Sequence, residues 1–161
     1  MRLKIIIPAV LIALAGCSQK VQTTQKDSSA ASDSLYVTLS SANIIKVGEK
    51  VNLRFVVHNR YSMGKSFCKW HTPFEPLMSK YLDIKDEQGN EAAYKGPMAK
   101  RIMPPPADSY LMVNPNDTLV TDVDLRKAYQ LDTGKKYTVS YNSGAISGLK
   151  SSSTTTFTIQ N

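Results

Sequence analysis

The chain has 161 residues, of which 42% are hydrophobic and 20% are charged, a composition typical of a globular protein with one domain. Its formal net charge is +7, from 20 lysine and arginine residues against 13 carboxylates. The basic residues are spread along the chain, so the excess gives weak attraction to anionic surfaces and argues against a nucleic-acid-binding protein.

Residues 1–17 have the pattern of a bacterial lipoprotein signal peptide. A basic tetrapeptide precedes an apolar run, residues 5–15, that is shorter than the roughly 20 residues of a membrane-spanning helix. The run ends in Leu-Ala-Gly before Cys17, which resembles the lipobox whose cysteine is lipidated and becomes the new N-terminus. An ordinary secretory signal with an incidental cysteine is the alternative. Ser18 follows in place of Asp, so the resemblance implies a lipid-anchored protein of the bacterial cell envelope, in the outer membrane where the host has one.

Residues 18–34 contain mostly Ser, Thr, Gln, Ala and Lys, and Val21 is their one large apolar residue. Such a segment buries too little apolar surface to order itself, so we expect a flexible tether between the lipid and the domain. The folded domain is then expected to span residues 35–161, and we expect it to be a monomer.

From Leu35 onward the sequence alternates between apolar and polar residues, which predicts half-buried β-strands. Short strands with turn residues between them predict an all-β protein, an immunoglobulin-like antiparallel β-sandwich of about seven to nine strands. One helical turn is expected at residues 125–129. The expected strands are residues 35–40, 51–58, 65–70, 81–84, 110–113, 118–125, 136–141 and 154–159, with an edge and a turn at residues 44–50.

Five residues are expected in the core of this sandwich. Trp70 falls on the third expected strand, where such folds bury a tryptophan, and Tyr137 resembles the tyrosine corner because it comes two residues before the inward Val139. An intersheet disulfide would need cysteines at positions that are apolar here, either Leu53 or Phe55 on one strand and Val139 on the other. Cys68, flanked by aromatic residues, is expected to be buried as a small hydrophobic residue, although pairing between chains is the alternative.

No catalytic motif emerges from the sequence, and we expect neither enzyme activity nor a cofactor. The two histidines, His58 and His71, have no partner at the H-E-x-x-H spacing, and G-x-S-x-G is absent. His71 and Glu75 have the residue types of metal ligands, but the pattern favours a histidine at the rim of the sandwich. The methionines are scattered, which argues against a metal-carrying protein, so no metal site is predicted.

A binding role has better support, from the long connection between residues 90 and 109. It contains Lys95, Lys100 and Arg101, followed by three consecutive prolines that stiffen the chain. Long loops on a rigid sandwich often carry function, whereas a solvated basic loop is the plain alternative. We therefore predict that these three basic residues bind a partner, with His71 and Glu75 as neighbours at the rim.

Three parts of the sequence together resemble a known domain. The segments Lys69–Glu75, Tyr94–Arg101 and Val123–Tyr129 with Tyr137–Val139 resemble, in this order, the β-rich N-terminal domain of the deuterolysin and peptidyl-Lys metalloendopeptidase family. The resemblance covers roughly residues 35–141. In that family the domain precedes a zinc protease, whose H-E-x-x-H motif does not occur in this sequence, and keeps the protease latent or helps it fold.

The resemblance implies a protein that binds a protease domain, as an inhibitor or as a chaperone. Lysine-preferring proteases of the family have an acidic pocket, which Lys95 or Lys100 would enter from the proline-stiffened loop. The competing interpretation is a structural or adhesive surface lipoprotein that binds glycan, peptide or another envelope protein, since immunoglobulin-like domains serve many binding roles.

Overall fold

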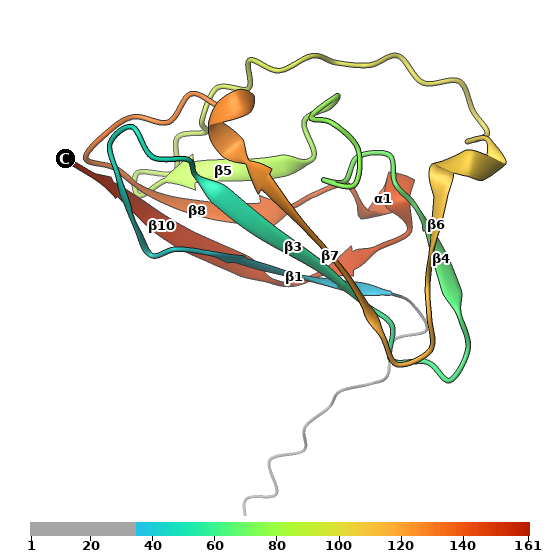
Figure 1. Ribbon diagram of the computed structural model, residues 1–161. Helices are drawn as coiled ribbons and strands as arrows, with labels where there is room; N and C mark the ends of the chain where they lie inside the picture. Colours follow the sequence, from blue (N-terminus) through green and yellow to red (C-terminus); the bar gives the residue numbers. More distant parts are fainter. Residues whose placement is uncertain (1–34) are drawn as a thin grey trace, which may run out of the picture. The chain divides into compact units, whose positions relative to one another are not determined.

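A computed structural model describes residues 35–161 of the chain (Figure 1). The expected signal peptide with Cys17, and the tether at residues 18–34, lie outside the described residues. In the part described, no helix is both long and apolar enough to cross a membrane.

Two four-stranded sheets and one two-stranded sheet make up the domain, which confirms the predicted all-β sandwich. The first sheet has the order β7 (Thr118–Asp124), β3 (Asn52–His58), β1 (Tyr36–Ser41) and β9 (Lys150–Ser151). The second has the order β2 (Ile44–Lys46), β10 (Thr154–Gln160), β8 (Lys136–Tyr141) and β5 (Leu82–Asp86). The third pairs β4 (Lys65–Cys68) with β6 (Tyr110–Val113).

Most strand pairs are antiparallel, but two are parallel: β1 with β9 and β2 with β10. Strands β1 and β2 follow one another in the chain yet join different sheets. The short helices are η1 (Ala107–Ser109), η2 (Leu125–Lys127) and α1 (Gly144–Ser147). The sequence predicted η2 but neither η1, α1 nor β9.

Alternation along β3 explains how the sheets pack. Leu53, Phe55 and Val57 are fully buried, and the residues between them are exposed or half-buried. Because successive side chains of a strand point to opposite faces, this spacing directs one face of the sheet into the core. The Phe55 ring meets Tyr141 of β8 edge to face, with centroids 5.2 Å apart, so the core joins the two sheets. Each such buried side chain contributes about 1.5–3 kcal/mol.

The predicted position of Trp70 on a strand is wrong. Strand β4 ends at Cys68, and Trp70 lies in the following turn, because the chain reverses at His71, where φ is 58°. Moreover β4 pairs with β6, and it is β5 that pairs with β8 in the second sheet. Trp70 is nevertheless buried, with 7% of its surface exposed, and Cys68 is a free, buried cysteine.

Candidate functional site

The turn after β4 is built by its own polar groups. The Thr72 hydroxyl donates to the Lys69 carbonyl oxygen at 2.6 Å and accepts from the Phe74 N–H at 3.2 Å. His71 adopts a positive φ of 58°, uncommon for a residue with a side chain, and its N–H donates to Glu75 Oε1 at 2.9 Å. The turn therefore fixes the Glu75 carboxylate, whose side chain is only 7% exposed.

Arg101 pairs with this carboxylate from the other side of the cluster. One guanidinium nitrogen of Arg101 lies 2.6 Å from Glu75 Oε2, and the guanidinium carbon lies 4.8 Å from the centroid of the Trp70 ring. A carboxylate withdrawn from water needs such a partner, because unpaired buried charge is costly. Arg101 thus ties the long connection to the turn that holds Trp70.

The charge state of the cluster follows from its neighbours. Burial lowers the pKa of His71 from its usual value of 6.5; the nearby Glu75 carboxylate opposes this, and Arg101 lowers the pKa further. His71 is therefore neutral at neutral pH, and the ion pair of Glu75 and Arg101 carries the charge. Among residues 35–161 there is no group of three or more His, Cys, Asp and Glu side chains positioned to hold a metal ion.

Residues 92–107, here called the basic loop, are fixed at several backbone points. The Lys95 N–H donates to the Ala128 carbonyl oxygen at 2.6 Å, and the Ala99 N–H donates to the Met78 carbonyl oxygen at 2.7 Å. At Gly96 a Cβ would lie 2.5 Å from the Tyr94 hydroxyl oxygen, so only glycine fits there without displacing the loop. These contacts and the Arg101 ion pair hold the loop against the sandwich.

The predicted partner-binding residues divide into two groups. His71, Glu75 and Arg101 come together beside Trp70, and each is half-buried. Lys95 and Lys100 are exposed, and neither ammonium group forms an ion pair within the described residues. Arg101 therefore acts as an anchor for the basic loop, while the two lysines face the solvent.

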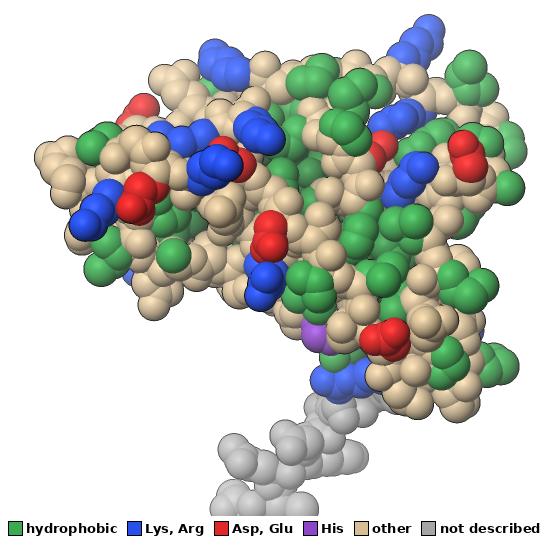
Figure 2. Space-filling model, in the orientation of Figure 1, with side chains coloured by type: hydrophobic (Ala, Val, Ile, Leu, Met, Phe, Trp, Pro, Cys, Tyr) green, Lys and Arg blue, Asp and Glu red, His purple; other side chains and the backbone are tan. Residues whose placement is uncertain are grey.

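Sequence reasoning missed three exposed apolar residues on the same loop. Ile102 is 84% exposed, Met98 70% and Met103 64%. Figure 2 shows hydrophobic and basic side chains together along the upper right edge, where Figure 1 places the long connection leading to η1. The signal was present in the sequence: an Ile-Met pair directly before three prolines, in a stretch with no carboxylate from residue 92 to residue 107.

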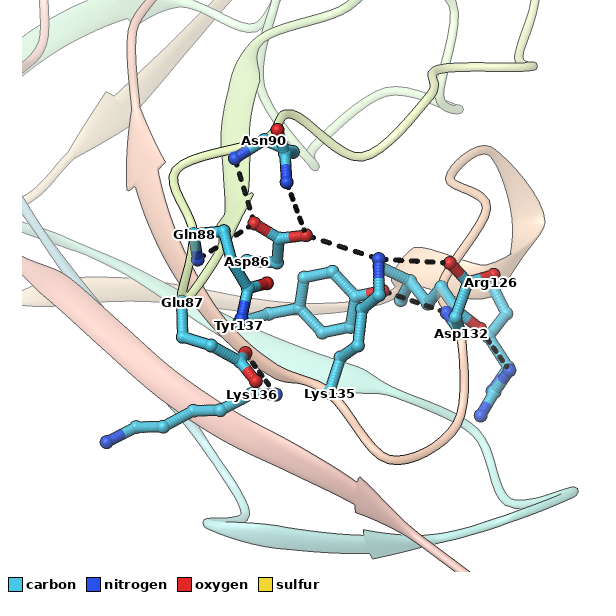
Figure 3. A network of polar contacts seen from close by, with 10 residues as sticks. Asp86, Glu87, Gln88, Asn90, Arg126, Asp132, Lys135, Lys136 and Tyr137 are labelled. Carbon is cyan, nitrogen blue, oxygen red and sulfur yellow. Dashed lines mark hydrogen bonds and ion pairs between the residues drawn. The ribbon is translucent and has the colours of Figure 1, made fainter.

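A second polar cluster lies at the turn after β5 (Figure 3). The Asp86 carboxylate accepts the N–H groups of Gln88 and Asn90 at 3.1 and 2.8 Å, and Lys135 lies 3.2 Å from its other oxygen. A cavity of about 190 Å³ borders this cluster. Since the carboxylate is already satisfied by its own turn and by Lys135, the cluster serves to fix the turn.

The predicted tyrosine corner has its hydrogen bond at the edge of this cluster. The Tyr137 hydroxyl accepts the Asp132 N–H at 2.9 Å, five residues upstream, and Tyr137 is only 2% exposed. This is the backbone contact expected of the corner in immunoglobulin-like sandwiches. Tyr137 and the Asp86 turn therefore brace the same end of β8.

The remaining histidine offers no reaction centre. His58 Nε2 lies 2.8 Å from the Thr38 hydroxyl, and its ring stacks on Tyr36 with centroids 4.6 Å apart. No carboxylate bonds to its ring within the described residues, so the third member of a catalytic triad is not in place there.

Comparison with known proteins identifies no relative: no protein-family model matches this sequence, and no curated protein matches it. The resemblance to the N-terminal domain of the deuterolysin family stays a prediction.

Proposed function

We propose that this chain is a non-catalytic lipoprotein of the bacterial cell envelope, anchored through Cys17, whose sandwich binds a protein partner through the basic loop. The observation that carries the proposal is the 84% exposure of Ile102 on a loop that is anchored to the sandwich by the Lys95 and Ala99 backbone and by the Arg101 ion pair. A cluster of exposed apolar residues on one surface commonly marks an interaction site.

The apolar side chains supply binding energy. Transfer of Met98, Ile102 and Met103 into an apolar pocket would gain about 25 cal/mol for each Å² removed from water. Because Arg101 and the backbone contacts hold the loop before binding, little conformational entropy is lost when the partner docks. A fixed loop with an apolar tip is thus suited to a pocket on another protein.

The basic residues of the loop indicate the charge that its partner should carry. Lys95 and Lys100 have no ion pairs within the described residues, and the basic loop contains no carboxylate of its own. A pocket with an acidic rim would attract these cations and speed association, most strongly at low salt. The partner we propose therefore has an apolar pocket surrounded by carboxylates.

The family resemblance supports a protease domain as this partner, with the chain as its inhibitor or chaperone. An acidic lysine pocket would receive Lys100, and the neighbouring Ile102 would fill an adjacent apolar subsite. Addition of the purified full chain to a lysine-preferring metalloprotease tests inhibition. Unchanged cleavage at micromolar chain would contradict the inhibitor role.

A photoreactive amino acid at position 102 tests the binding proposal itself, in the full chain expressed in a bacterial envelope. We expect one dominant adduct with a protein. Position 44 is the matched control, because Ile44 is 60% exposed but lies on β2, at the edge of the second sheet. If position 102 gives no adduct, or position 44 gives the same adduct in equal yield, the basic loop is not the binding surface.

A further inference from the structure

Strand β7 forms an open edge of the first sheet. It pairs with β3 on one side, and within residues 35–161 no strand pairs with its other side. In Figure 1 it is the long orange strand in front, running beside β3. Its seven residues include neither glycine nor proline, the residues that commonly interrupt an exposed edge. This edge is separate from the basic loop.

Hydrogen bonds at its two ends show which backbone groups point outward. The Leu125 N–H donates to the Val51 carbonyl oxygen, and the Asn59 N–H donates to the Asp117 carbonyl oxygen, both at 2.9 Å. The register of β3 and β7 is continuous between these pairs, and hydrogen-bonded pairs alternate along an antiparallel ladder. Odd-numbered residues of β7 therefore bond to β3, and even-numbered residues direct their N–H and C=O groups away from the sheet.

The outward groups are largely free. The Thr118 N–H donates to the Asp117 carboxylate at 2.7 Å. The outward N–H and C=O groups of Val120 and Asp122 have no hydrogen-bond partner in the described part of the chain. Val120 is 49% exposed and the Asp122 side chain 50% exposed, so both positions face solvent. The edge is a template for another strand.

We propose that β7 pairs with β7 of a second copy of this chain, antiparallel about a two-fold axis at Val120. In this register each Val120 lies opposite Val120 of the second copy, and each Asp122 lies opposite Thr118 of the second copy. The outward N–H groups of Val120 and Asp122 donate to the carbonyl oxygens of Val120 and Thr118. The Asp117 bond to Thr118 stays in place.

The side chains of β7 favour a second copy of the chain as its partner. A valine pair at the centre covers the one exposed large hydrophobic residue of the strand, and a directly opposed β-branched pair contributes about 0.2–1 kcal/mol. The two Asp122 carboxylates are kept apart, so no like charges are opposed. An identical surface on both copies closes the assembly at two subunits. Because the contact is mainly one pair of strands, the dimer is weak.

Amide hydrogen exchange on the full chain in a mild non-ionic detergent tests the pairing. When the chain is concentrated enough to dimerise, the amides of Val120 and Asp122 are expected to exchange at least about tenfold more slowly than in the dilute monomer. The amides of Leu119, Thr121 and Val123 stay protected at every concentration because they bond to β3. Light scattering over the same concentrations reports the mass.

Val120→Lys opposes two like charges at the axis, so it is expected to abolish the concentration dependence and leave a monomer. Protection at Thr121 shows that the variant remains folded. Val47→Lys is the matched control, because Val47 is 56% exposed in the turn after β2, and it is expected to dimerise like the parent chain. Exchange at Val120 that does not depend on concentration, or a Val120→Lys chain that still dimerises, would overturn the proposal.

Discussion

Two ion pairs of this domain differ in what they connect. Asp86 and Lys135 join two turns at one end of the second sheet, and Asp86 also binds the backbone of its own turn. Glu75 and Arg101 join residues 26 positions apart in the sequence, and Arg101 also stacks on Trp70. The first pair fixes a tight turn, whereas the second fixes a long loop with exposed apolar residues.

The two clusters are alike in how well their polar groups are satisfied. The Asp86 carboxylate has partners on both oxygens, and the Glu75 carboxylate bonds to His71 and Arg101. Each network also contains one buried guanidinium nitrogen without a hydrogen-bond partner in the described residues, Arg101 Nε in one and Arg126 Nη2 in the other. The clusters therefore differ in the segment that each one holds, a tight turn in the first case and the basic loop in the second.

Replacement of Trp70 gives the largest expected effect. Trp70→Ala removes a buried aromatic side chain and the surface on which Arg101 stacks, so the free energy of unfolding should fall by about 3 kcal/mol in urea titration. The Ala99 amide of the basic loop should also exchange faster, while the Asn90 amide in the Asp86 turn is unaffected. Equal acceleration at both amides would show that Trp70 supports the whole domain and has no special role in the loop.

Glu75→Gln should have the next largest effect. It leaves the half-buried Arg101 guanidinium without its countercharge, at a cost of about 2 kcal/mol of unfolding free energy. Asp122→Asn is the matched control, because Asp122 pairs with Arg54 in an ion pair whose side chains are 50% and 58% exposed. The control should change the stability by no more than about 0.5 kcal/mol. Similar losses in both variants would remove the distinction between anchor and surface ion pair.

The strands are largely predictable from the sequence, for a physical reason. Leu53, Phe55 and Val57 are spaced at the period of the strand itself, so burial of one face is encoded locally. Strand β9 has only two residues, Lys150 and Ser151, and forms by parallel pairing with β1. Nothing local marks it, because its hydrogen bonds depend on a strand more than a hundred residues earlier in the chain.

The candidate site is less predictable. His71 and Glu75 are close in sequence, but the contact of Arg101 with both Glu75 and Trp70 depends on the path of a long loop. Sequence reasoning favoured the charges and missed Ile102, although the Ile-Met pair before three prolines is a signal in the sequence; the 84% exposure of Ile102 confirms that the core does not use it. The sequence predicts Trp70 on a strand because immunoglobulin-like folds bury a tryptophan there, although Thr72 and Pro73 already indicate a turn.

Acid should destabilise the domain partly by protonating the Asp86 carboxylate. Burial alone would raise the pKa of Asp86 from 3.8, but hydrogen bonds from Asn90 and the Lys135 contacts outweigh burial and lower it. A carboxyl whose pKa is lower in the folded chain stabilises the fold above its unfolded pKa, and this stabilisation is lost as the pH falls through the folded pKa. As the pH falls through the unfolded and then the folded pKa of Asp86, the parent should therefore lose more stability than Asp86→Asn. Identical acid profiles in urea titration would show that Asp86 contributes nothing through its charge.

Tyr137→Phe should have the smallest effect on the unfolding free energy. It tests whether the end of β8 beside the Asp86 turn has only a structural role, with no influence on the basic loop. The variant keeps the buried ring and removes only the oxygen that accepts the Asp132 N–H at 2.9 Å. Asp132 lies in an exposed turn where water can replace that acceptor, so the unfolding free energy should fall by about 1 kcal/mol. The Asp132 amide should exchange faster, while the Ala99 amide of the basic loop and photocross-linking from position 102 stay unchanged. Loss of the cross-link in Tyr137→Phe would mean that the two ends of the domain are coupled, and that the separation of architecture from binding surface does not hold.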